Sequence, residues 1–394
     1  MSRRTTRASS VRFEFATATR ILFGPGTLAE LGSTVAGLGR RALLVRGRTV
    51  ERAAPARAGL AAAGVEVVDF AVTAEPTVAD VRRGSAAGRD QAVSVVVACG
   101  GGSAIDTGKA IAALLGNGGD PLDYLEVVGA GRPLERPSLP FVAVPTTAGT
   151  GSEVTRNAVL ASPEHRVKAS LRSPHMLARA AIVDPDLLLG LPPQVTAASG
   201  LDAFAQLLEP FVSGRANPLV DALCREGLLR SARSLRRAFA GDEAEPVRVD
   251  LALASLFGGL ALANAGLGAV HGFAAPVGGM FDAPHGAACA ALLAAAVRVN
   301  ARALVERQPD SPALQRYREA AAIVTGRPGA FVDELVRWIE TLVGSLQVPG
   351  LGHWGASAAD VPALVARARG ASSMKGNPIV LTEDELTEIA TASL

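Results

Sequence analysis

The residues that say most about the fold are Val93–Ala110, which read VSVVVACGGGSAIDTGKA. Val93–Cys99 is a β-branched run, typical of a buried strand, and three glycines follow it directly. The residues after the glycines read as the start of a helix. The sequence therefore predicts a strand, a tight turn and a helix, an arrangement that offers backbone N–H groups and a positive dipole end to a pyrophosphate.

This turn matches neither of the two common nucleotide-binding motifs. Ser103 and Ala104 follow the third glycine, which departs from G-x-G-x-x-G, and Ala110 after Lys109 departs from the Walker A loop. A purely structural tight turn would also explain the glycines. Lys109 favours a functional turn, because it lies one to two helical turns beyond them in a chain whose 39 basic residues include only Lys109, Lys168 and Lys375 as lysines.

Around this stretch, short apolar runs alternate with amphipathic segments. Strands are predicted at Ala42–Val45, Val65–Phe70 and Phe141–Val144, and helices at Ala53–Ala63 and Val78–Ala87. This alternation predicts parallel β-α-β units in a doubly wound sheet, where ligands bind beyond the carboxyl ends of the strands. A second turn, PTTAGTGSE at Pro145–Glu153, follows the last of these strands, so the two turns are expected to form two sides of one dinucleotide cleft.

The sequence pattern changes after Asp184 and Pro185, where Ala/Leu-rich segments typical of helices replace the strand-like runs. We therefore expect three parts: a flexible arm at residues 1–12, an α/β Rossmann-like dinucleotide-binding domain at 13–190, and an all-α domain at 191–394. Residues 251–281 contain no Asp, Glu, Lys or Arg, and the glycines and Pro276 that interrupt them favour buried helices over a membrane span.

Composition excludes several classes of protein. A net charge of +2 and 4% aromatic residues argue against nucleic-acid binding, which favours basic stripes with stacking aromatics. Cys99, Cys224 and Cys289 are scattered and odd in number, which indicates a reducing cytoplasm. The basic N-terminus leads into no apolar segment and is not a signal peptide. No membrane partner is expected.

At these residues the chain resembles the iron-containing (group III) alcohol dehydrogenase family, which has the dehydroquinate synthase-like fold. The resemblance covers about residues 10–394 and rests on five motifs in the family's order. They are GGGSAIDTGKA, PTTAGTGSEVT, VDP at 183–185, GLDAF at 200–204, and VHG…APHGA at 270–287.

The resemblance implies NAD(P) bound to the first domain. The positions that match the family's cofactor contacts are Gly100, Gly101, Gly102, Ser103, Asp106, Thr146, Thr147, Thr155, Asn157 and Lys168. Lys168 resembles the lysine beside the nicotinamide ribose. Gly47, between Arg46 and Arg48, stands where the family often has an acid for the adenosine ribose, and an arginine there accepts a 2′-phosphate, which favours NADP slightly.

The resemblance also implies a divalent metal, iron or zinc, facing the second domain. The family's ligands are an aspartate, a histidine four residues later, and two later histidines. Asp202, His271 and His285 match, but Gln206 replaces the first histidine. Ala275 is a second departure, because the family often has another histidine there, and alanine neither relays a proton nor binds a metal.

Three roles for Gln206 remain open. Its amide oxygen ligates the metal as a weak neutral donor, or it orients a water in the fourth position, or the site is metal-free and Gln206, His271 and His285 donate hydrogen bonds to a carbonyl. Lys375, in SSMKGNP, reads as a solvated loop residue or a substrate-side group.

The expected function is reversible hydride transfer between a nicotinamide and a small-molecule alcohol, aldehyde or ketone. The expected catalytic residues are His271, His285 and Lys168. One alternative is a metal-independent reductase resembling maleylacetate reductase. Another is a lyase like dehydroquinate synthase, which the scarcity of lysine disfavours. Self-association into a homo-oligomer is expected, as is common for such enzymes.

Overall fold

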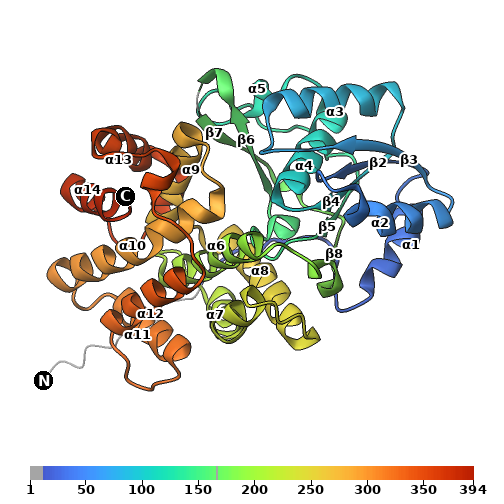
Figure 1. Cartoon of the computed structure of the whole chain (residues 1–394). Helices are drawn as coiled ribbons and strands as arrows, with labels where there is room; N and C mark the ends of the chain where they lie inside the picture. Colours follow the sequence, from blue (N-terminus) through green and yellow to red (C-terminus); the bar gives the residue numbers. More distant parts are fainter. Residues whose placement is uncertain (1–11, 166) are drawn as a thin grey trace, which may run out of the picture.

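The computed structural model describes residues 12–165 and 167–394, so the predicted arm lies, apart from Arg12, outside the described residues. The first domain contains a parallel sheet with the order β1-β8-β5-β4-β2-β3 (Figure 1). Its strands are β1 (Ile21–Phe23), β2 (Arg41–Arg46), β3 (Glu66–Ala71), β4 (Val95–Gly100), β5 (Phe141–Pro145) and β8 (Ala180–Val183). Its helices are α1 (Leu31–Ala36), α2 (Val50–Ala62), α3 (Val78–Asp90), α4 (Gly102–Asn117) and the short α5 (Pro121–Tyr124).

Both faces of this sheet are buried, which explains why its central strands are apolar at every position. Leu43 and Val45 of β2 share a core with residues of α3 and α4, whereas Leu44 packs with residues of α1 and α2 on the opposite face. Successive side chains of a strand point to opposite faces, so continuous apolar runs form a sheet covered by helices on both sides.

The predicted strands and helices of this half are confirmed, with ends that differ by at most three residues. The antiparallel hairpin of β6 (Asn157–Ser162) and β7 (Val167–Arg172) was not predicted, and neither were the edge strand β1 and strand β8. The hairpin projects from the sheet toward the helical domain and carries Asn157 and Lys168 (Figure 1).

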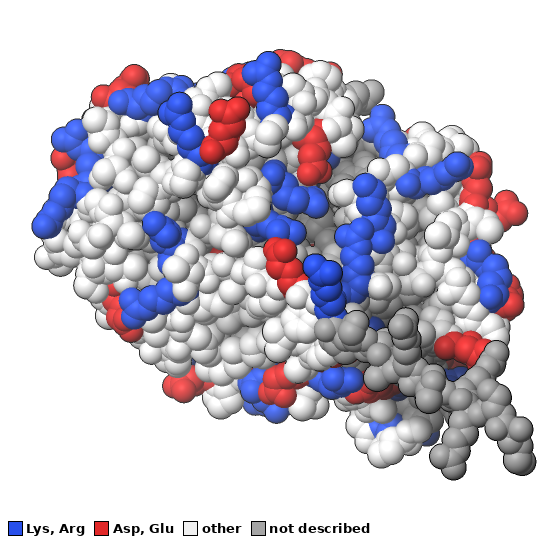
Figure 2. All heavy atoms as spheres, turned by 180° about the vertical axis from the view of Figure 1, so that it is seen from behind, with Lys and Arg blue, Asp and Glu red and all other residues white. Residues whose placement is uncertain are grey.

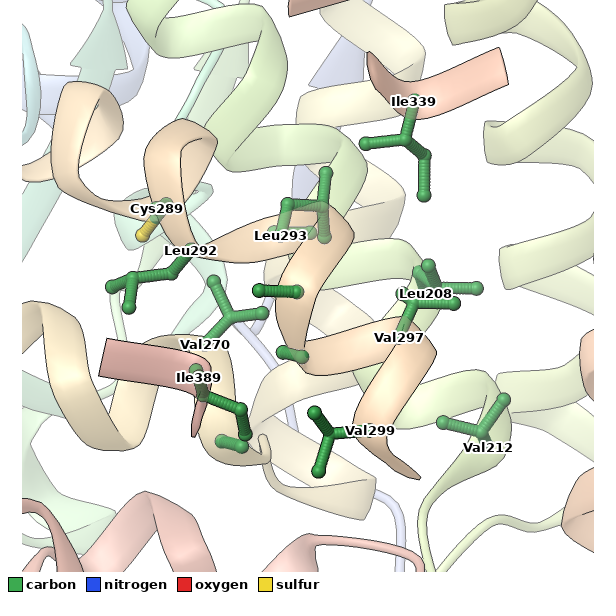
Figure 3. Close-up of a cluster of buried hydrophobic side chains, with 14 of the residues drawn as sticks. Leu208, Val212, Val270, Cys289, Leu292, Leu293, Val297, Val299, Ile339 and Ile389 are labelled. Atoms are coloured by element: carbon green, nitrogen blue, oxygen red, sulfur yellow. The ribbon is translucent and has the colours of Figure 1, made fainter. Parts of the chain in front are cut away.

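The second half is all-helical. Its helices are α6 (Pro193–Val212), α7 (Pro218–Phe239), α8 (Glu245–Ala265), α9 (Ala269–Phe281), α10 (His285–Arg307), α11 (Pro312–Thr325), α12 (Val332–Ser345), α13 (Val361–Gly370) and α14 (Glu383–Ala392). Its core gathers side chains from α6, α9, α10, α12 and α14, including Leu208, Val270, Leu293, Ile339 and Ile389 (Figure 3). The fold class predicted from the sequence is confirmed, with the last strand ending at Val183 and the first long helix beginning at Pro193.

Two helices, α8 and α10, have the length and hydropathy of a membrane span. In the folded chain, 61% of the apolar window of α8 and 72% of that of α10 are buried inside the protein. The uncharged stretch at 251–281 forms most of α8 together with α9, and both helices contribute to the helical core. Such burial is typical of core helices in soluble proteins.

Candidate active site

The two glycine-rich turns lie side by side at the carboxyl ends of β4 and β5, as predicted. Gly100 pairs with Pro145 in the sheet, and α4 begins at Gly102, so its first N–H groups open at this edge. A Cβ on Gly102 would lie 2.6 Å from the Cγ2 atom of Thr150, which explains the glycine. The turns form a close-packed cradle with exposed backbone, the shape that a pyrophosphate requires.

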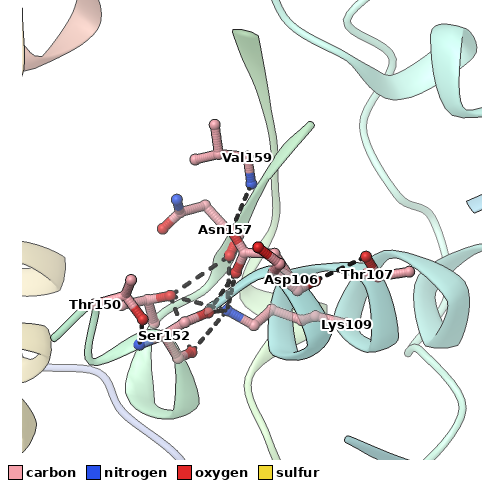
Figure 4. A network of polar contacts seen from close by, with 9 residues as sticks. Asp106, Thr107, Lys109, Thr150, Ser152, Asn157 and Val159 are labelled. Atoms are coloured by element: carbon pink, nitrogen blue, oxygen red, sulfur yellow. Dashed lines mark hydrogen bonds and ion pairs between the residues drawn. The ribbon is translucent and has the colours of Figure 1, made fainter. Parts of the chain in front are cut away.

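Lys109, on α4, is bonded to the second turn and to the start of β6 (Figure 4). Its ammonium donates to the carbonyl oxygens of Ser152 and Asn157 at 2.7 Å each, and to the hydroxyls of Ser152 and Thr155 at 2.9 Å each. Asp106, one turn earlier on α4, accepts from the N–H of Val159 at 2.9 Å and from the Ser152 hydroxyl. The network fixes the second turn and strand β6 against α4.

Lys109, which the sequence offered as a sign of a functional turn, is a buried part of this internal network. Its side chain is only 1% exposed, and all of its hydrogen bonds end on protein atoms. Burial lowers the Lys109 pKa, although Asp106 and Glu153 nearby oppose this. Thr155, at 4% exposure, belongs to the same internal network, as does Asp106. Both residues therefore shape the cradle, while Gly101, Gly102, Ser103, Thr147 and Asn157 are partly exposed beside it.

Gly47 follows β2 and lies against the first glycine turn. A Cβ on Gly100 would lie 3.2 Å from the Gly47 nitrogen, whereas a Cβ on Gly47 would meet no atom within 4 Å among the described residues. Arg46 pairs with Asp69 at 2.9 Å, and Arg48 donates to the Thr73 carbonyl at 2.7 Å. Position 47 thus has open space beside two guanidinium groups.

A second cluster of polar side chains is embedded in the helical domain. The Asp202 Oδ1 atom, on α6, lies 3.2 Å from the Nε2 atom of His271 and 3.7 Å from that of His285. His271 is on α9, and His285 is the first residue of α10. Cys289, one turn further on α10, has its sulfur 3.8 Å and 3.7 Å from these two nitrogens. The ligand atoms of these four residues all lie within 4.8 Å of one another.

Glu209 fixes the orientation of His271. One of its carboxylate oxygens lies 2.6 Å from the Nδ1 atom of His271, and the other accepts from the N–H of Val270 at 2.7 Å. With Nδ1 directed at a carboxylate, Nε2 faces Asp202 and Cys289. A carboxylate behind a histidine is the usual support of a metal-ligating imidazole, so the donor set fits a divalent cation.

Gln206 lies beside this cluster on α6, one turn after Asp202. Its amide forms a hydrogen bond with Asp202, whereas its Oε1 atom is buried with no hydrogen-bond partner among the described residues. A Cβ on Gly258 of α8 would lie 3.5 Å from Oε1. In this arrangement the amide supports Asp202, and its oxygen is directed to α8.

The charges of the cluster support one another. Burial alone would raise the pKa of Asp202, but the charge of His285 and the hydrogen bond from His271 outweigh it and lower this pKa. Burial would likewise lower the pKa of His285, yet Cys289 and Asp202 raise it to about 9.

The nucleotide cradle and this cluster are joined through α8. The left-handed Gly151 of the second turn packs on Gly259, and a Cβ on Gly259 would lie 2.3 Å from the Gly151 carbonyl oxygen. The preceding residue, Gly258, packs on Gln206. The contact needs glycine at both 151 and 259, because any side chain would separate the two domains at this point.

Lys168 lies across the cleft from the turns. Its ammonium pairs with Glu75 at 3.1 Å, and a Cβ on Gly278 of α9 would lie 2.9 Å from it. Helical spacing puts Gly278, Ala275 and His271 on one face of α9, so Ala275 stands between Lys168 and the polar cluster. Figure 2 shows a hollow between the two domains flanked by Lys and Arg side chains.

The structure therefore brings together the predicted Asp202, Gln206, His271 and His285. Sequence reasoning missed Glu209 and Cys289. Both could have been found by helical spacing, because Asp202, Gln206 and Glu209 lie at i, i+4 and i+7 on α6, and His285 and Cys289 lie at i and i+4 on α10. Lys375 is exposed, as expected of a solvated loop residue.

Comparison with known proteins agrees with this geometry. The family model of iron-containing alcohol dehydrogenase matches residues 18–185. The family model of the C-terminal region of Fe-containing alcohol dehydrogenases matches residues 196–394. The chain is 34% identical to the choline dehydrogenase of Bacillus subtilis (strain 168) over 372 residues, which cover 93% of this chain and 91% of that protein.

Two further relatives span nearly all of the chain. Lactaldehyde reductase of Escherichia coli (strain K12) is 32% identical over 378 residues, 93% of this chain and 96% of that protein. The crystal structure of a 1,3-propanediol oxidoreductase is 32% identical, with a TM-score of 0.88 over 97% of this chain and 100% of that chain. The chain thus belongs to the iron-containing alcohol dehydrogenase family and is a nicotinamide-dependent oxidoreductase that interconverts alcohols and carbonyl compounds.

Proposed function

We propose that this protein interconverts a small aldehyde and its primary alcohol with NADP(H), assisted by a divalent metal held by Asp202, His271 and His285. The observation that carries the proposal is the convergence of two imidazole nitrogens, of His271 and His285, within 3.7 Å of the Asp202 oxygen, with Glu209 behind His271. When bound, the nicotinamide supplies the hydride, and the metal supplies a Lewis acid that polarises the carbonyl oxygen.

The cofactor is held by the cradle at the ends of β4 and β5. Gly100, Gly101, Gly102 and Ser103 offer backbone N–H groups to the pyrophosphate, and Thr146, Thr147 and Asn157 line the opposite side. Asp106 and Thr155 keep these groups in place through the internal network around Lys109. Lys168, on the hairpin beside α9, would hold the ribose next to the nicotinamide.

On the helical side, His271 and His285 are the groups nearest the reacting oxygen. The side chain of His285 is 33% exposed, in contrast to 5% for His271 and 2% for Asp202, so substrate reaches the cluster past His285. Gln206 supports Asp202 through its amide and is the weakest donor of the set. Ala275 carries no titratable atom, which leaves water entering beside His285 as the proton source.

The preference for NADP is supported by the end of β2. Gly47 has no acidic side chain to repel a 2′-phosphate, and its surroundings are open among the described residues. Arg46 and Arg48 flank it. Within the described part of the chain, the Arg48 guanidinium is bonded only to the Thr73 carbonyl, from which a phosphate would draw it at little cost.

The substrate class is supported by the names of the relatives, which act on lactaldehyde, 1,3-propanediol and choline.

We propose that the protein is cytoplasmic and forms a homo-oligomer. Light scattering would test the oligomeric state. Its support is the free edge of strand β1, next to an open apolar groove. The groove is lined by Phe15, Thr17, Ile21, Leu219, Ala222, Leu223, Glu226, Phe257 and Leu260.

The test is the metal content of protein purified without chelator, together with NADPH oxidation in the presence of lactaldehyde and other small aldehydes. We expect about one zinc or iron per chain, loss of activity on chelation and recovery on adding metal. Gln206→His is expected to bind the metal more tightly. The metal-free alternative is favoured instead if wild type has no stoichiometric metal and added zinc or iron leaves NADPH oxidation unchanged.

A further inference from the structure

We propose that the thiolate of Cys289 is a fourth protein ligand of the metal and that it makes this a zinc site. The inference rests on the proposed metal site of Asp202, His271 and His285, to which it adds a donor one turn after His285 on α10. It accounts for how the site keeps four protein donors although position 206 has no imidazole.

The distances between the donors fit a tetrahedral ion. With zinc bonded at about 2.0–2.3 Å to oxygen, nitrogen and sulfur, neighbouring donors of a tetrahedron lie roughly 3.3–3.6 Å apart. Here the Cys289 sulfur lies 3.8 Å from the His271 nitrogen and 3.7 Å from the His285 nitrogen. The Asp202 oxygen lies 3.2 Å and 3.7 Å from the same nitrogens. These four distances are within a few tenths of an ångström of tetrahedral values, and all four donor atoms lie within 4.8 Å of one another.

The position of Cys289 differs from that of an ordinary core cysteine. Cys99 and Cys224 are buried in apolar clusters of the sheet and of the helical domain. Cys289 is also buried, but it lies at the edge of its cluster, where α10 begins, with its sulfur directed away from Leu293 and Val297 (Figure 3). It faces two imidazoles and a carboxylate, which are metal-ligating groups.

Gln206 competes poorly for the same role. Its amide is engaged with Asp202, and its oxygen lies toward Gly258 of α8. An amide oxygen is neutral, whereas Cys289 loses its proton on binding and becomes an anion. Together, Asp202 and Cys289 balance the two charges of the cation inside a buried site, where an unbalanced charge is costly. A soft thiolate also favours zinc over ferrous iron.

The experiment uses the full-length protein, stripped with chelator and reloaded with cobalt(II) as a spectroscopic probe. Thiolate ligation gives an intense near-ultraviolet charge-transfer band, while the visible d–d bands report binding independently of sulfur. We expect both in wild type. Cys289→Ser is expected to lose the charge-transfer band and to bind cobalt at least about tenfold more weakly. Cys224→Ser, a matched buried control, is expected to keep the band, with folding of both variants checked by circular dichroism.

The outcomes separate the two proposals. Stoichiometric d–d bands without a charge-transfer band in wild type overturn the role of Cys289 while leaving the metal site intact. Retention of the charge-transfer band in Cys289→Ser also overturns it. Failure of wild type to bind cobalt at all overturns both this inference and the proposed metal site. A charge-transfer band that disappears only in Cys289→Ser supports both.

Discussion

The Glu209 carboxylate and the His271 imidazole lie 2.6 Å apart, buried between α6 and α9. This contact directs the other imidazole nitrogen, Nε2, toward Asp202 and Cys289. Since the second carboxylate oxygen of Glu209 accepts from the backbone of α9, the orientation of the ring is built into the packing of the two helices.

The first prediction concerns this pair. Glu209→Gln keeps the shape of the side chain but removes the charge that supports the imidazole. We expect zinc or cobalt to bind about 10–100-fold more weakly, measured by competition with a chromogenic chelator. Glu388→Gln, which removes an exposed partner of Arg302, is the control and should leave the affinity unchanged. Equal affinities for wild type and Glu209→Gln would contradict this role.

The second prediction concerns cofactor choice. Gly47→Asp fits the open space at this position and puts a negative charge beside the proposed 2′-phosphate. We expect the ratio of kcat/KM for NADPH to that for NADH to fall by at least about tenfold, because like charges repel. Gly47→Asn has nearly the same size without the charge and should retain more of the preference. A ratio equally changed in both variants would mean that size decides, not charge.

The third prediction concerns the buried ammonium. Lys109→Met leaves Asp106 and the carbonyl oxygens of Ser152 and Asn157 without their cation. We expect the free energy of unfolding to fall by about 3 kcal/mol or more, measured by urea denaturation, with weaker binding of the cofactor. Lys375→Met, at an exposed position, should change stability by less than about 0.5 kcal/mol. Similar losses in both variants would refute a structural role specific to Lys109.

The fourth prediction concerns pH. Burial raises the pKa of Glu153 from 4.5 to about 7, against the effects of a backbone hydrogen bond and of Lys109. Between these two values the folded protein holds a proton that the unfolded chain has released. The free energy of unfolding should therefore fall as the pH rises through this window, and the contribution is present in full only below it.

Glu153→Gln removes the titrating group and should flatten this part of the pH profile. Urea unfolding of wild type and variant at about pH 5 and about pH 8 measures the difference. The exposed Glu164→Gln serves as the control, because its profile should parallel that of wild type. Parallel profiles for wild type and Glu153→Gln would show that Glu153 does not titrate in this range.

Most of the α/β half could be predicted, because local patterns determine it. Continuous β-branched runs such as Val95–Val97 pack on both faces of a sheet, and the glycines after them are the mark of a turn. The hairpin β6–β7 was not predicted, although the burial of its strands alternates as in a half-buried strand, and it lies outside the main sheet. Strand β1 has three residues, too few for periodicity to be recognised.

For the site, the sequence identifies the residues whose side chains can ligate a metal or take part in the reaction. Asp202, His271 and His285 stand in motifs that the family shares, and Gln206 and Ala275 are visible as departures from them. Which other side chains lie beside these site residues is visible only in the tertiary structure. Lys109, which favoured a functional turn, is a buried residue that bonds α4 to the second turn, and Cys289, one of three scattered cysteines, faces two imidazoles. Helical spacing relates residues within one helix, but it does not show which helices pack together. Because α6, α9 and α10 join residues up to 87 positions apart, from Asp202 to Cys289, their contact could not be predicted from local patterns.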